Sequence, residues 1–195
     1  GYTHVELHPV MEYMEDQTDG YSTSSYFAPT SRFGTPEDFQ KLVDALHQKG
    51  IGVILDWTPA QFPRYEGGLE NFDGTPLYEL KDPAAAVHPI WGTLLYNYES
   101  PMVKDFLISN ACFWMEVYHV DGLRLDDVDA MLYLDFGRKA GEWQPNMYGS
   151  NENLAAIEFL KHLNSITRKR NPGVLLIAQE DGLWPELTDS VENDH

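Results

Sequence analysis

The chain has 195 residues, of which 43% are hydrophobic, and this is enough for one domain with its own core, which we expect to span residues 1–195. Its formal net charge of −18 repels nucleic-acid phosphates and anionic membranes, so neither is an expected partner, whereas a neutral substrate is compatible. No apolar run is long enough to span a bilayer, and no signal-peptide pattern opens the sequence. Cys112 is the only cysteine, which favours a reducing, cytoplasmic location.

The first part of the chain predicts a strand, a helix and a second strand. Residues 2–10 form a short apolar stretch that predicts a buried strand. A helix should follow between Thr35, a good N-cap, and Gly50, a good C-terminal stop. The continuous apolar run at 51–57 is typical of a strand covered on both faces.

This unit then repeats along the chain. The pattern predicts a helix from Ser100 to about Tyr118, a strand at 119–126, a helix at 151–169 and a strand at 174–179. Strands that alternate with helices imply an α/β fold with a parallel sheet and right-handed crossovers. The connections at 57–99 and 126–150 are unusually long, so we expect them to be functional or to hold small elements of their own.

Polar side chains stand at the ends of the predicted strands. Asp56, Asp126, Gln179 and Glu180 each lie at or near such an end. In parallel α/β sheets the chemistry gathers beyond the carboxyl ends of the strands. These residues should therefore face one shared pocket.

The segment "DGLRLDD" carries the clearest local signal. Arg124 and Asp126 are two residues apart on a strand, so they project to the same side of the sheet. A guanidinium beside a carboxylate keeps it ionised, as nucleophilic attack on an acetal carbon requires. A purely structural ion pair explains the same spacing, and Asp56 could likewise be a turn cap.

Other site types find less support. Asp126, Asp127 and Asp129 could suggest a Mg²⁺ or Ca²⁺ site, but adjacent acids on a strand end point in opposite directions and no EF-hand loop is present. The histidines lack zinc spacing, so we expect no metal. Tyr21 could stack on a sugar ring or could simply be packed.

Five segments in order resemble one family. They read "SYFAPTSRFGTPEDF", "GIGVILDWTPAQFP", "FDGTPLYEL", "DGLRLDDVDAMLY" and "IAQEDGLWP". Together they are similar to the bacterial 1,4-α-glucan branching enzymes of the α-amylase superfamily, glycoside hydrolase family thirteen, from residue 1 to about residue 190. The resemblance implies part of a (β/α)₈ TIM barrel, about strands two to five of eight. It also implies retaining transfer of an α-1,4-glucan segment to a 6-hydroxyl in glycogen biosynthesis, with no cofactor.

The resemblance assigns roles to individual residues. Asp126 occupies the position of the nucleophile, and Arg124 is its supporting cation. Tyr21 and Asp56 match positions that line the subsite where the bond breaks. The family's third carboxylate would lie beyond residue 195, so we do not expect this chain to catalyse alone.

The chain departs from the family pattern at three places. Gln179 stands at the general acid/base position and Glu180 at the next acidic position, unless the alignment slips by one residue, which strand alternation makes costly. Gln61 replaces a histidine that bonds the sugar. Asp127 and Asp129 replace small neutral residues and should raise the pKa values of neighbouring carboxylates.

These departures predict weakened or lost catalysis, because an amide cannot donate or accept the proton at the leaving oxygen. The sequence therefore leaves two main readings open: a branching-type transferase, or a degenerate barrel that binds glucan without turnover. A hydrolase of the same superfamily is a third.

Overall fold

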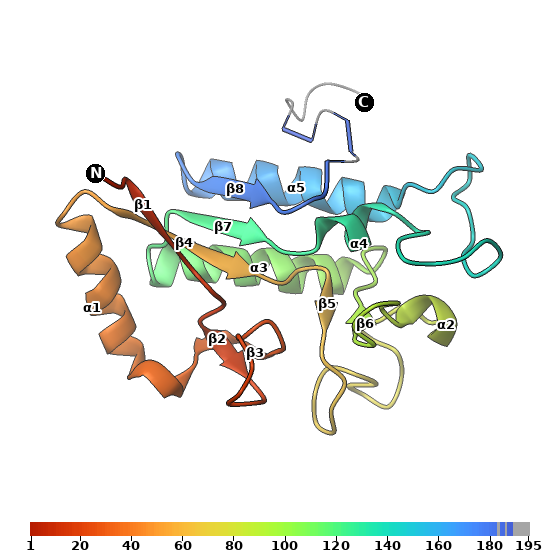
Figure 1. Ribbon diagram of the computed structural model, residues 1–195, viewed down its shortest axis with the longest axis horizontal. Helices are drawn as coiled ribbons and strands as arrows, with labels where there is room; N and C mark the ends of the chain where they lie inside the picture. The colour runs from red at the N-terminus through yellow and green to blue at the C-terminus, as the bar shows by residue number, and fades with distance from the viewer. Residues whose placement is uncertain (183, 186, 189–195) are drawn as a thin grey trace.

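The computed structural model describes residues 1–182, 184, 185, 187 and 188. Its centre is a four-stranded sheet in which every neighbouring pair is parallel. The strands are β1 (His4–Leu7), β4 (Gly52–Trp57), β7 (Gly122–Leu125) and β8 (Leu175–Ala178), and they lie in the sheet in the order in which they occur along the chain. The arrows of β4, β7 and β8 point the same way in Figure 1, toward the short helix α4. The expected α/β fold with a parallel sheet is confirmed.

Three longer helices connect these strands. They are α1 (Pro36–His47), α3 (Pro101–Val117) and α5 (Leu154–Arg170), and α3 packs against α5 (Figure 1). The start of α1 is fixed by a capping box, in which the Thr35 hydroxyl accepts from the Asp38 N–H while the Asp38 side chain accepts from the Thr35 N–H. Sequential strands that neighbour each other and are joined by helices form an open part of a (β/α)₈ barrel, with β1 and β8 at the edges of the described sheet.

The core fills the space between the sheet and α3. Its largest fully buried side chains include Trp57, Trp114, Tyr96, Phe62, Phe159, Leu55 and Leu107. The Trp57 indole N–H donates to Asn110 Oδ1 at 2.8 Å, and Asn110 Nδ2 donates to the Tyr26 carbonyl oxygen at 2.6 Å. This buried amide satisfies polar groups that would otherwise be stranded in an apolar environment.

The connecting segments hold several small elements. They are β2 (Met11–Tyr13), β3 (Thr23–Pro29), the 3₁₀ helix η1 (Ser31–Phe33), β5 (Gln61–Phe62), α2 (Pro83–Ala86), β6 (Leu94–Leu95) and α4 (Val128–Leu132). β2 pairs with β3 and β5 with β6, both antiparallel. The two long connections therefore carry local structure, as their length predicted.

The strands are shorter than the sequence indicated. The strand expected at 2–10 is confined to His4–Leu7, because Pro9 lacks the N–H that a ladder needs. The strand expected at 119–126 begins only at Gly122, after His119 with its positive φ of 56°. Among the described residues, no helix is both long and apolar enough to cross a membrane.

Candidate functional site

The carboxyl ends of three neighbouring strands meet at one place. Trp57 of β4 is the register partner of Leu125 in β7, and Leu125 is the partner of Ala178 in β8. The ladder continues for one residue, because the Asp126 N–H donates to the Trp57 carbonyl and the Gln179 N–H donates to the Leu125 carbonyl, both at 2.9 Å. The residues that follow these strands are thereby held close together.

Arg124 joins two carboxylates at this end of the sheet. Its Nη1 lies 3.2 Å from Asp56 Oδ2 and 3.4 Å from Asp126 Oδ1. Asp56 is only 2% exposed, and its Oδ1 has no hydrogen-bond partner among the described residues. A buried acceptor of this kind is a ready contact for a ligand hydroxyl, since burial without a partner is costly.

Tyr21 reaches the same carboxylate from a different part of the chain. Its hydroxyl donates to Asp56 Oδ2, and its ring lies edge-on to the His8 ring with centroids 5.7 Å apart. Burial, together with the hydrogen bond to Asp56, raises the pKa of the Tyr21 phenol. Tyr21 is therefore a neutral donor at physiological pH.

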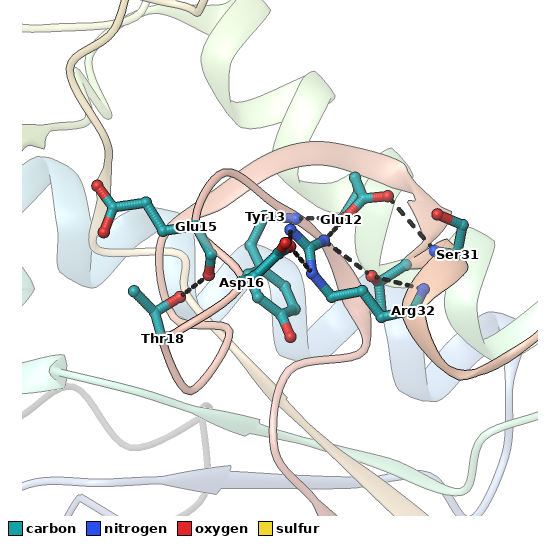
Figure 2. A network of polar contacts seen from close by, with 8 residues as sticks. Glu12, Tyr13, Glu15, Asp16, Thr18, Ser31 and Arg32 are labelled. Atoms are coloured by element: carbon teal, nitrogen blue, oxygen red, sulfur yellow. Dashed lines mark hydrogen bonds and ion pairs between the residues drawn. The ribbon is translucent and has the colours of Figure 1, made fainter.

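The loop that carries Tyr21 is anchored by an arginine (Figure 2). The Arg32 guanidinium bonds Glu12 of β2, and its Nε donates to Asp16 Oδ1 at 2.8 Å. The same guanidinium lies 4.0 Å from the centroid of the Tyr13 ring, within the range of a cation–π contact. These contacts tie the beginning of the loop between β2 and β3 to η1.

The surroundings of Asp126 raise its pKa, although Arg124 acts in the opposite direction. Burial raises its pKa, the charges of Asp127 and Asp56 add to that effect, and Arg124 lowers it only in part. Arg124 lowers the pKa of Asp126 in the expected direction, but burial and the neighbouring carboxylates outweigh its effect. The expectation that Asp127 raises the pKa of a neighbouring carboxylate agrees with the direction at Asp126.

Gln179 and Glu180 turn in different directions. Gln179 Oε1 accepts from the Asp127 N–H at 2.9 Å, so this side chain lies against the chain that leaves β7. Glu180 instead accepts from the backbone N–H groups of Gly182, at 2.6 Å, and Trp184, at 2.8 Å. Of the two side chains, it is that of Gln179 that lies beside the backbone following Asp126.

Gln61 lies in the same neighbourhood. Its Nε2 donates to Asp127 Oδ2 at 3.3 Å, and its Oε1 accepts from the Thr93 hydroxyl. The side chain thus belongs to a network that includes Asp127, and through the Asp127 N–H also Gln179.

Sequence reasoning missed His88. Its side chain is fully buried, and its Nε2 is 2.8 Å from Asp127 Oδ2. It lies 39 residues before Asp127, in a long connection, and no spacing signal links the two. The only hint in the sequence is its place before Pro89 in an aromatic-rich loop.

Asp129 contributes a further buried carboxyl behind the site. Its Oδ2 accepts from the Asp181 N–H at 3.1 Å. Burial raises the pKa of Asp129, and the charge and hydrogen bonding of Glu180 raise it further. Within the described residues, no group of three or more His, Cys, Asp and Glu side chains is arranged to hold a metal ion.

Comparison with known proteins confirms the resemblance. Residues 1–60 match the family model "Alpha amylase, catalytic domain". The chain is 53% identical over 192 residues, 98% of its length, to the 1,4-alpha-glucan branching enzyme GlgB of Thermobifida fusca, and 56% identical over 188 residues, 96% of its length, to that of Methylococcus capsulatus. It covers 26% and 25% of those two proteins, about a quarter of each.

Solved structures agree at the level of the fold. The α-amylase of Geobacillus thermoleovorans, solved in complex with acarbose, superposes with a TM-score of 0.63 at 20% identity, over 91% of this chain and 36% of that one. The expectation of an α-amylase-type partial barrel is confirmed.

Proposed function

We propose that this chain, which belongs to the α-amylase family and is similar to its branching enzymes, carries the part of an α-glucan site at which a sugar–sugar bond is attacked. In the proposed reaction Asp126 is the nucleophile, and the glucosyl group it takes from an α-1,4-glucan passes to a 6-hydroxyl of another glucan. Two displacements at the same carbon retain its configuration. No metal or organic cofactor takes part.

The grouping of Arg124 with Asp56 and Asp126 carries the proposal. A retaining transfer needs a carboxylate beside the anomeric carbon, and a cation within 3.4 Å favours its charged form. The unpartnered Oδ1 of Asp56 supplies an acceptor for a sugar hydroxyl. The Tyr21 oxygen, whose proton is donated to Asp56, supplies a second acceptor. Tyr21 also offers a ring face of the kind that packs on sugars.

A second candidate function is glucan binding without turnover. Gln179 favours it, because a carboxamide at the acid/base position neither protonates the leaving oxygen nor activates the acceptor, a step typically worth about 10²–10⁴-fold. Its oxygen already accepts from the Asp127 N–H, so the amide is held in a fixed orientation. Such an amide suits recognition of an intact glycosidic bond better than its cleavage.

The two candidates are separated by an assay of the full-length protein on amylose. A branching transferase lowers the iodine absorbance while few reducing ends appear, and a hydrolase raises reducing ends. A binder changes neither, yet is retarded in gels that contain amylose. The Asp126→Asn variant is the control: it should abolish the change in iodine absorbance and keep the retardation.

The cytoplasm is the compartment we propose. The single cysteine, Cys112, is buried as a free thiol in α3, and burial raises its pKa, which keeps it unreactive. A protein of this kind suits a reducing environment in which a glycogen-like glucan is available.

A further inference from the structure

Each of the three places at which the chain departs from the branching-enzyme pattern contributes one residue to a single network centred on Asp127. Gln61 donates from Nε2 to the Asp127 carboxylate, and the Asp127 backbone N–H donates to Gln179 Oε1. We propose that Asp127 is a positioning residue that couples positions 61 and 179, so that its carboxylate makes a neutral amide the fitting side chain at both. This inference deepens the proposed glucan site and rests on it.

The partners of the Asp127 carboxylate are neutral donors. His88 Nδ1 accepts from the backbone N–H groups of Ile90 and Trp91, both at 3.2 Å, so that nitrogen carries no proton. The proton must then be on Nε2, which donates to Asp127 Oδ2 at 2.8 Å. Neither of these two donors, Gln61 and His88, offsets the negative charge of the Asp127 carboxylate, whose side chain is only 14% exposed.

That charge already acts on its surroundings. It raises the pKa of Asp126, and it contributes to the raised pKa of the buried Tyr98 phenol. Arg124 bonds Asp56 and Asp126, and no hydrogen bond or ion pair between Arg124 and Asp127 occurs among the described contacts. Any ionisable group that enters at position 61 or 179 therefore meets the field of Asp127.

This field explains why the departures occur together. A carboxylate at position 179 could still accept from the Asp127 N–H, which favours its charged form, but the neighbouring charge of Asp127 would push it toward its protonated form. An imidazole at position 61 would be pulled toward its charged form and would become an ion-pair partner rather than a neutral contact for a sugar. Glutamine avoids both effects, because it donates and accepts without titrating.

The first test measures the titration of a carboxyl introduced at position 179. The full chain, labelled with ¹³C at glutamate side chains, is titrated as Gln179→Glu and as Gln179→Glu combined with Asp127→Asn. Asparagine keeps an acceptor oxygen and tolerates the φ of 61° at this position, so the double variant should fold. We expect the introduced carboxyl to titrate about one pKa unit or more higher when Asp127 is present. Equal pKa values in the two variants would overturn the coupling.

The second test introduces a base at position 61, where the same upward pKa shift favours the charged form instead of the neutral one. In Gln61→His, the introduced imidazole should titrate about one unit or more higher with Asp127 than with Asp127→Asn, as followed by its ring protons. Gln48→His on the exposed end of α1 is the matched control, and its pKa should not respond to Asp127→Asn. The proposal would be contradicted if the pKa of the imidazole at position 61, like that at position 48, did not respond to Asp127→Asn.

These titrations need neither glucan nor turnover. A failure of the coupling therefore shows as unchanged pKa values, whereas a failure of the proposed function shows as absent glucan binding. The coupling further predicts that Gln179→Glu alone recovers less branching activity in the full-length protein than the triple change Gln179→Glu, Gln61→His and Asp127→Ala. An equal recovery by the single change would also count against it.

Discussion

The side-chain oxygen of Gln179 accepts a hydrogen bond of 2.9 Å from the backbone N–H of Asp127. The contact ties the end of β8 to the residue after Asp126 at the end of β7. Neighbouring residues at a strand end face opposite sides, and Glu180 accordingly turns to the backbone of Gly182 and Trp184. The side chain beside the backbone that follows the proposed nucleophile is therefore an amide.

Replacing Asp126 by asparagine should stabilise the chain at neutral pH. The folded state raises the pKa of Asp126, so ionisation costs folding free energy, and that cost is absent at low pH and appears as pH rises through the titration. Asp126→Asn should therefore raise the melting temperature at pH 7, and the gain should fade below about pH 4, the ordinary range of an aspartate. Calorimetry across pH 3–8 measures this, and a gain that grows toward low pH would contradict it.

Removing Arg124 should destabilise the chain by about 1–3 kcal/mol, because it leaves the 2%-exposed Asp56 without its cation. Arg124→Gln, measured by urea unfolding, gives the cost. In the double variant with Asp56→Asn the loss should be smaller than the sum of the two single losses, since the buried charge of Asp56 is then no longer present to be left unpaired. Strict additivity would show that Arg124 and Asp56 do not interact.

Asn110, although polar, should contribute substantially to the free energy of unfolding. Asn110→Ala strands the Trp57 indole N–H and removes one of the two donors to the Tyr26 carbonyl, the other being Trp114, and should cost about 2–4 kcal/mol. Gln48→Ala is the matched control, because it also removes a side-chain amide bond, here to Asp44, but on the surface. Its cost should stay within about 0.5 kcal/mol.

Tyr21→Phe should weaken binding of a maltooligosaccharide while leaving the fold intact. The change keeps the ring that packs on a sugar and removes the hydroxyl that bonds Asp56, so we expect a loss of about 5–10-fold in affinity, equal to one hydrogen bond. Isothermal titration with maltoheptaose measures it. Tyr148→Phe, at a tyrosine that is 77% exposed, should change nothing. Equal losses of affinity in the two variants would show that Tyr21 is not part of the glucan site.

Most of the longer helices and strands of this fold can be predicted from the sequence. The continuous apolar run that becomes β4, and the Thr35–Asp38 cap of α1, are local signals with local causes. The small elements cannot be predicted in this way. β2 and β3 pair with register shifts, and Asp127, the residue before α4, has a left-handed conformation; neither feature leaves a periodic pattern in the sequence. Their geometry depends on contacts between distant parts of the chain.

The candidate site was predicted in part for the same reason. Asp126 follows Arg124 by two residues at the end of β7, so their proximity follows from spacing alone. The contact of Asp127 with Gln61 and His88 joins residues 66 and 39 positions apart, and no local rule connects them. Sequence reasoning named Gln61 and Asp127 as separate departures; only the fold places them in one network.

The most direct test of the central claim is to trap the covalent intermediate. α-Glucosyl or α-maltosyl fluoride carries a leaving group that departs without a proton donor, so the missing acid at position 179 does not block the first step. The full-length protein should gain the mass of one glycosyl group, on the peptide that contains Asp126, and Asp126→Asn should gain none. The adduct should persist, because Gln179 cannot activate the acceptor. A protein that stays unlabelled, or that carries the sugar on Glu180, would contradict the account.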